Sequence, residues 1–277
     1  MPRADRHRVP ADAGLFDPLQ LQPAAVGRIT FDAGTRWLRR HLISHRRLLT
    51  ECGTGLVVWS VRIRYERALG FADTEELGVR TQVMALCGGG QVRCEVAIDD
   101  GRDTRPAVRA SLVLIPLRIE GEPSLAGNPA ALDPRLLKLF RHDELLPVPH
   151  TSPVPRLRRE LGRLGAPRAR ASTAFRIHRH MCEMADQWFW PTALTLAATG
   201  RAELIRGCAR PPERVPDGLS RPVRTLDVLL ERPFYLFDEG RVVSSVWSDA
   251  DGPTFVHELR SGDSERGLEH GWVVERW

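Results

Sequence analysis

The sequence has few features of a membrane, secreted or metal-binding protein. Apolar runs in its 277 residues are short, as at 111–117, and none approaches the roughly 20 residues that cross a bilayer. The charged N-terminal segment lacks the apolar stretch of a secretory signal. The five cysteines are scattered and have no C-x-x-C spacing, which argues against a disulfide framework or a zinc site. We therefore expect a cytoplasmic protein with no metal, no cofactor and no membrane span.

Lysine is nearly absent, since Lys138 is the only lysine among 40 basic residues. The formal net charge is +5, but acidic residues are interspersed and no basic block with interleaved aromatic residues occurs. We therefore expect no nucleic-acid partner. Hydrophobic residues (42%) and charged residues (27%) lie in the ordinary range of globular proteins, which excludes a collagen-like or wholly disordered chain. The length suits one large or two small domains.

The first half predicts a helix followed by an antiparallel meander. Residues 1–26 have little periodicity and are expected to form a flexible arm. A helix is predicted over 35–50, because Leu38, Leu42 and His45 share one face. Alternating apolar and charged residues, separated by glycine-containing turns, then predict four strands. These strands are 56–66, 76–86, 91–98 and 106–119.

The second half predicts a similar unit after a connector. Residues 120–172 are rich in Pro, Gly and Arg and read as this connector, with short helices near 134–141 and 154–164. A strand at 174–179 and a helix at 191–205 follow, the helix with Pro191 in its first turn. Further strands are predicted at 223–231, 241–248, 254–260 and 271–277. The predicted units are therefore 27–119 and 173–277.

The two halves also repeat each other. Residues 66–69 with Asp73 (ERAL, then D) align with 231–234 and Asp238 (ERPF, then D) at an offset of 165. Residues 91–98 correspond to 254–261 at an offset of 163. The shared order of elements supports a tandem duplication.

Two stretches carry a resemblance to a known architecture. Residues 61–83 (VRIRYERALGFADTEELGVRTQV) resemble a strand pair of thioesterases, and residues 175–194 (FRIHRHMCEMADQWFWPTAL) resemble their strand–loop–helix signature. The chain is therefore similar to the double hotdog acyl thioesterases. This resemblance implies an α+β fold of two tandem hotdog units, each a curved antiparallel sheet wrapped on one long helix. It also implies a thioester hydrolase. In the signature D-x-D-x-x-G-H-V-N, Glu183 stands at a common Asp position, Asp186 at the Gly and Gln187 at the His.

Thioester hydrolysis needs a carboxylate, N–H donors for the developing oxyanion and an apolar slot. Glu183 and Asp186 in the loop before the second helix are the candidate catalytic acids, with Gln187 to position water or the carbonyl. Acidic residues before a helix also serve as helix caps, and this purely structural role is an alternative for both acids. His45, on the apolar face of the first helix, is a further catalytic or pocket candidate. The backbone around 188–190 is the expected source of N–H donors.

Five further residues are candidate substrate contacts. Aromatic side chains in the acidic loop could wall an acyl slot or pack in the core, and nearby cations could bind a carboxylate or phosphate. We expect only the second half to be catalytic, because the first-half counterpart of the loop is predicted at 31–34, where Asp32 reads as a helix cap. The candidate contacts are Trp188, Trp190, His180, Arg39 and Arg179.

The preferred function is hydrolysis of an acyl-CoA or acyl-carrier-protein thioester in a specialised polyketide or fatty-acyl biosynthetic pathway. The alternatives are addition of an amine such as glycine to an α,β-unsaturated thioester, dehydration, acyl transfer and non-catalytic acyl binding. The arginine-rich segment 156–179 is expected either to recruit an acidic or phosphate-bearing carrier or to be a solvated face. The sequence leaves open whether the protein forms a homodimer.

Overall fold

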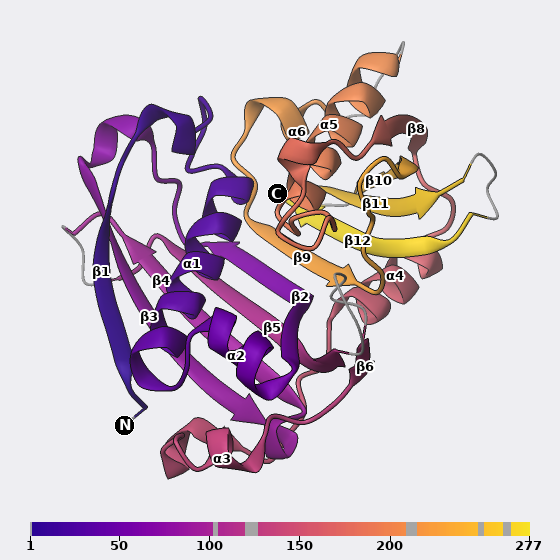
Figure 1. Cartoon of the computed structure of the whole chain (residues 1–277). Coiled ribbons are helices and arrows are strands. Elements are labelled where there is room, and N and C mark those ends of the chain that lie inside the picture. The colour runs from indigo at the N-terminus through magenta and orange to yellow at the C-terminus, as the bar shows by residue number, and fades with distance from the viewer. Residues whose placement is uncertain (1, 102–104, 120–126, 209–214, 249–251, 263–266) are drawn as a thin grey trace. The chain divides into compact units, whose positions relative to one another are not determined.

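The chain folds into two compact units, Met1–Thr151 (unit 1) and Ser152–Trp277 (unit 2). This computed structural model describes all residues except 1, 102–104, 120–126, 209–214, 249–251 and 263–266 (Figure 1). The boundary falls inside the predicted connector 120–172, so part of that segment belongs to each unit. No helix in the described part of the chain is long and apolar enough to cross a membrane.

Unit 1 contains an antiparallel sheet in the order β1-β3-β4-β5-β2. The four strands predicted from alternating side chains are present, with ends shifted by two residues or fewer. Short strands extend the sheet, β6 (Gly127–Pro129) beside β5 and β7 (Leu145–Leu146) beside β3. The main strands are β1 (Ala4–Pro10), β2 (Thr54–Tyr65), β3 (Glu76–Leu86), β4 (Gln91–Asp99) and β5 (Val108–Ile119), and a short helix α3 spans Pro134–Leu137.

Helix α1 (Pro23–His41) lies across one face of this sheet and contacts β3, β4 and β5 (Figure 1). The prediction of a single helix over 35–50 is wrong in two ways: the helix begins earlier, at Pro23, and it ends at His41, before a second helix begins. The Ser44 side chain accepts the Arg47 N–H and begins a second helix, α2 (His45–Cys52). The part of α1 before residue 35 shows little periodicity because small residues face the sheet there. At Gly34, for example, a Cβ atom would lie 3.0 Å from the Cys94 Sγ.

The flexible arm predicted for residues 1–26 is also wrong. Residues 4–10 form β1, which pairs with β3 along its whole length. Asp5 is 1% exposed and binds Arg36 and Arg40 of α1 through its two carboxylate oxygens. The sequence conceals this strand because a charged residue points inward, where two cations from a distant helix neutralise it.

Unit 2 repeats the plan with an antiparallel sheet in the order β9-β12-β11-β10-β8. Helix α5 (Thr192–Gly207) contacts β8, β10 and β11, and α4 (Val154–Arg163) contacts β9 and β12. A short helix, α6, spans Asp217–Ser220. The strand predicted at 174–179 is displaced, because β8 ends at Arg176. The strands are β8 (Ala169–Arg176), β9 (Thr225–Leu230), β10 (Glu239–Ser248), β11 (Pro253–Ser261) and β12 (Glu269–Arg276).

A buried polar network links α5 to the sheet of unit 2. The Ser244 Oγ lies 2.8 Å from His257 Nδ1, and His257 Nε2 lies 3.1 Å from a Glu275 carboxylate oxygen. Arg201 of α5 donates to the same oxygen. Burial alone would raise the Glu275 pKa, but the Arg201 charge and the His257 hydrogen bond outweigh it and lower the pKa to about 2. The carboxylate is therefore held ionised inside the unit.

The predicted repeat has a structural counterpart at Asp73 and Asp238. The Asp73 carboxylate accepts the Gly70 N–H at 2.6 Å, and the Asp238 carboxylate accepts the Tyr235 N–H at 2.8 Å. In both turns the Asp N–H also donates back to the carbonyl three residues earlier. The preceding residues Leu69 and Phe234 are both fully buried. Each unit thus contains the same turn at the offset of 165.

Candidate functional site

The loop before α5 leaves the sheet at Arg176 and returns through a short helical turn at 179–181. Backbone hydrogen bonds fix its path: Phe189 N–H donates to the Met181 carbonyl at 2.7 Å, and Trp188 N–H donates to the Phe234 carbonyl at 2.8 Å. The loop is therefore tied to the turn that Asp238 closes. This arrangement orders the segment that the sequence predicts as catalytic.

Glu183 and Gln187 form a carboxylate–amide pair inside this loop. The Gln187 side-chain N–H donates to a Glu183 carboxylate oxygen, and the Glu183 N–H donates to the Gln187 carbonyl at 2.8 Å. Gln187 is buried and Glu183 is partly buried. Burial raises the Glu183 pKa, while the Gln187 hydrogen bond opposes the rise. The structure therefore brings together two of the predicted catalytic residues.

Asp186 lies in the same loop but in a different environment. Its carboxylate forms an ion pair with Arg179, and its side chain is 57% exposed. Its φ of 54° is left-handed, as is that of Phe237 at 71°, and the Leu236 N–H donates to the Asp186 carbonyl. Two non-glycine residues with left-handed backbone thus lie at or beside one hydrogen bond. Such strained backbone conformations occur preferentially at functional sites. The predicted substrate contact Arg179 therefore forms an ion pair with Asp186.

The predicted aromatic contacts differ from one another. Trp188 is buried and packs edge-to-face on Phe234, with ring centroids 5.1 Å apart. Phe234 also stacks on His270 at 3.7 Å. Trp190 is 5% exposed, and its indole N–H has no hydrogen-bond partner among the described residues. Trp188 is therefore part of the core behind the loop, whereas Trp190 retains an unused donor.

The N–H donors expected at 188–190 are mostly engaged. The Trp188 and Phe189 N–H groups donate to backbone carbonyls within the unit, whereas the Trp190 N–H has no backbone acceptor among the described residues. His180 lies beyond the end of β8, exposed, with its ring parallel to that of His178 and 6.0 Å away. Burial and the Asp186 charge raise the Cys182 thiol pKa, which disfavours a thiolate nucleophile.

The first-half counterpart of this loop is not at 31–34, as the sequence predicted, because those residues lie inside α1. The counterpart is 13–22. Gln22 N–H donates to the Leu15 carbonyl at 2.8 Å and Leu21 N–H to the Leu69 carbonyl at 2.7 Å, matching the bonds of Phe189 and Trp188. Both loops contain an acidic residue, then a glutamine, then a proline, separated by a few residues each. These are Asp17, Gln20 and Pro23 in the first loop and Glu183, Gln187 and Pro191 in the second. That shared order was the signal available in the sequence.

The two loops use their acids differently. The Asp17 carboxylate accepts two backbone N–H groups, from Leu19 and Gln20, each at 2.8 Å. Glu183 instead accepts the side-chain amide of Gln187. Asp17 therefore stabilises its own loop, whereas Glu183 is a partly buried carboxylate with a raised pKa.

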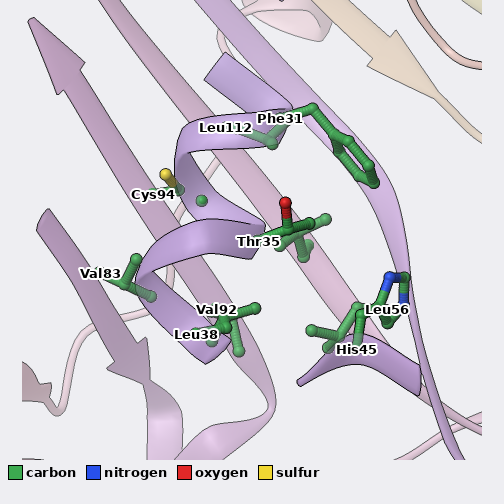
Figure 2. A pocket seen from close by; sticks show the side chains of 11 residues that line it. Phe31, Thr35, Leu38, His45, Leu56, Val83, Val92, Cys94 and Leu112 are labelled. Atoms are coloured by element: carbon green, nitrogen blue, oxygen red, sulfur yellow. The ribbon is translucent and has the colours of Figure 1, made fainter. Parts of the chain in front are cut away.

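His45 lies in unit 1 and lines a small apolar pocket between α1 and the sheet (Figure 2). The cavity volume is about 10 Å³, room for about one water molecule. Burial lowers the His45 pKa, so the imidazole is neutral at pH 7. In unit 2 the layer between α5 and the sheet contains the Ser244–His257–Glu275 network instead. The lining residues are Phe31, Gly34, Thr35, Leu38, His45, Leu56, Val83, Val92, Cys94, Leu112 and Leu114.

The remaining basic candidates are dispersed. Arg39 is exposed on α1. Within the segment 156–179, Arg158 stacks on Trp272 at 4.5 Å and Arg176 pairs with Glu239. Among the described residues, no cluster of three or more His, Cys, Asp or Glu side chains could hold a metal ion.

No family model and no curated protein matches this sequence, but solved structures match it over its full length. A Lactobacillus plantarum protein assigned as an oleoyl thioesterase matches with a TM-score of 0.75 and 10% identity, covering 100% of this chain and 95% of its own. The 12:0-ACP thioesterase of Umbellularia californica matches at 0.67 and 10%, covering 99% and 96%. An acyl-ACP thioesterase of Bacteroides thetaiotaomicron matches at 0.63 and 11%, covering 99% and 97%. The predicted double hotdog fold is confirmed.

Proposed function

We propose that this protein hydrolyses an acyl thioester and that Glu183 is its general base. The observation that carries the proposal is the partly buried Glu183 carboxylate, whose pKa is raised and which Gln187 holds by a hydrogen bond. A carboxylate with a raised pKa is a stronger base than a carboxylate with an ordinary pKa. The double hotdog fold of thioesterases supports the same reaction class, although a fold hosts many activities.

In this reaction Glu183 takes a proton from a water molecule, and the water oxygen attacks the thioester carbonyl. The carbon–sulfur bond then breaks, and the thiolate takes up a proton as it leaves. The N–H groups of Trp190 are candidate donors to the developing oxyanion, because neither its backbone nor its indole N–H has a partner among the described residues. Asp186 and Arg179 are proposed to hold the loop in its strained conformation.

The proposed substrate is an acyl thioester of CoA or of acyl carrier protein, within a biosynthetic pathway. Two of the structural neighbours act on acyl-ACP, as their names state. The protein should be incubated with acyl-CoA and acyl-carrier-protein thioesters of several chain lengths, and free thiol release should be measured. Parallel reactions with glycine and analysis of acyl products separate hydrolysis from amine addition.

Glu183→Gln keeps the size and hydrogen bonding of the side chain and removes its charge. We expect turnover to fall by ~100-fold or more, because a general base contributes ~10²–10⁴ in rate. Asp186→Asn is the matched control in the same loop and should lose less than ~10-fold. Release of free acid at the wild-type rate by Glu183→Gln would overturn Glu183 as the base. Substrate binding without thiol release in the wild type would favour an acyl-binding protein instead.

A further inference from the structure

The outer face of the unit 1 sheet, opposite α1, carries a row of arginines. In the strand register, Arg64 of β2 lies opposite Arg109 of β5, and Arg6 of β1 lies opposite Arg80 of β3. Ala97 of β4 is the position between Arg109 and Arg80. Directly opposite residues of antiparallel strands point to the same face. Arg6, Arg80, Arg109 and Arg64 therefore form one row across five strands, called the arginine row below.

The row points away from α1. Val79 and Thr81, which flank Arg80, are buried, as alternation along a strand requires of the opposite face. All four arginines are exposed. In the described part of the chain, Arg6, Arg64 and Arg80 form no ion pair, and the Arg109 Nε is 3.7 Å from a Glu66 carboxylate oxygen. The row is therefore a solvent-facing line of four cations, three of which form no ion pair within the described part of the chain.

This arrangement is unfavourable for the isolated unit. Like charges directly opposite on adjacent strands are destabilising, and the row contains two such pairs, Arg64 with Arg109 and Arg6 with Arg80. An anionic partner with matching spacing would convert this repulsion into charge-assisted hydrogen bonds. We propose that the arginine row is a docking surface for an acidic helix of a partner protein. The proposal concerns binding and does not depend on the thioesterase reaction.

The spacing fits a helix laid across the strands. Adjacent strands lie about 4.8 Å apart, so five strands span about 19 Å. A helix rises about 5.4 Å per turn, so carboxylates on successive turns of one face recur at nearly the strand spacing. The flexible arginine side chains absorb the small difference. A helix of about four turns would thus place one carboxylate near each arginine.

The charges beside the row favour a protein over a polyphosphate. Glu66 directly follows β2 and Glu95 lies on β4. Glu66 pairs with Arg109, and Glu95 accepts a hydrogen bond from the Ser111 hydroxyl and pairs with Arg93. These carboxylates would repel a uniform line of phosphates on nucleic acid or on an anionic membrane. A helix with interspersed basic residues can complement both signs.

The probe is a fluorescein-labelled, alanine-based helical peptide with glutamates on successive turns of one face. Its control is an isomeric peptide with the same glutamates distributed around the helix. By fluorescence anisotropy at low ionic strength, we expect the aligned peptide to bind more tightly than the control and to lose affinity as salt is raised. The double variant Arg80→Gln/Arg109→Gln should weaken binding by about tenfold.

Two further variants keep this test interpretable. Arg6→Gln/Arg64→Gln removes the ends of the row and should also weaken binding. Arg159→Gln/Arg163→Gln removes the same charge from exposed positions on α4 and should leave binding within about twofold of the wild type. Thermal unfolding of the row variants should occur no lower than in the wild type, because repulsion is relieved. The proposal fails if the row variants bind like the wild type, if both peptides bind equally, or if duplex DNA or anionic vesicles bind more tightly.

Discussion

Gln187 donates its side-chain amide to the carboxylate of Glu183. Burial raises the Glu183 pKa, and this hydrogen bond opposes the rise because it stabilises the ionised form. A general base is active only when deprotonated. The rate of the proposed hydrolysis should therefore fall as pH drops through the Glu183 pKa, at a pH above that of an ordinary glutamate, about 4.3.

The variant Gln187→Met keeps a similar side-chain volume and removes the hydrogen bond. The Glu183 pKa should then rise further, so the acidic limb of the pH profile of kcat/KM should move to higher pH. Asp186→Asn should leave this limb in place, because Asp186 is exposed and contacts Arg179 instead. An unshifted limb in Gln187→Met would show that Glu183 does not control the profile.

His45 is expected to act through packing. Burial among apolar side chains lowers its pKa, and its pocket has room for about one water molecule. His45→Leu replaces a desolvated imidazole by an apolar side chain, so we expect turnover within about threefold of the wild type and no loss of thermal stability. Steady-state kinetics and thermal unfolding measure both. A ~100-fold loss of turnover in a stably folded His45→Leu variant would contradict this expectation and indicate that His45 is catalytic.

The matched turns at Asp73 and Asp238 provide an internal control. Asp73→Ala and Asp238→Ala each remove a carboxylate that accepts a backbone N–H, and each should cost about 1 kcal/mol of stability. Only the Asp238 turn pairs with the candidate loop, through Gln187 and Tyr235. We therefore expect Asp238→Ala alone to reduce turnover of a thioester substrate. Equal losses of turnover would contradict the assignment of the site to unit 2.

Glu275 should control the acid stability of unit 2. Its folded pKa of about 2 lies below the ordinary value of about 4.3, so its stabilising effect is present above about 4.3 and is lost as pH falls toward 2. Glu275→Gln should cost about 3–5 kcal/mol near neutral pH, because Arg201 is left without its buried partner.

Denaturant unfolding measured from neutral to acidic pH tests this prediction for Glu275. The destabilisation by Glu275→Gln should shrink as the pH is lowered through that window. Glu160→Gln, at a half-exposed carboxylate near Arg156, should change stability by less than about 0.5 kcal/mol. A constant difference between wild type and Glu275→Gln across the pH range would show that Glu275 is not the titrating group.

Much of the fold follows from the sequence because its determinants are local. Alternation over residues such as 76–86 predicts strand β3 at its observed limits. The offset of 165 between Asp73 and Asp238 identifies the duplication, and both carboxylates close the same turn. Glu183 and Gln187 are each candidates from the sequence, since both lie in one short loop before a helix, but their hydrogen bond is seen only in the structure.

Other features depend on residues that are distant in the chain. Strand β1 forms because Arg36 and Arg40 of α1 neutralise the inward Asp5. The loop 13–22 is identified as the counterpart of the candidate loop by its backbone hydrogen bonds, one of which reaches Leu69. Glu183 and Asp186 look equivalent in the sequence, and their burial and side-chain partners in the folded chain distinguish them. The arginine row exists because the strand register aligns four residues scattered between positions 6 and 109. Periodicity along the chain determines which face a side chain takes, whereas tertiary pairing determines its neighbours.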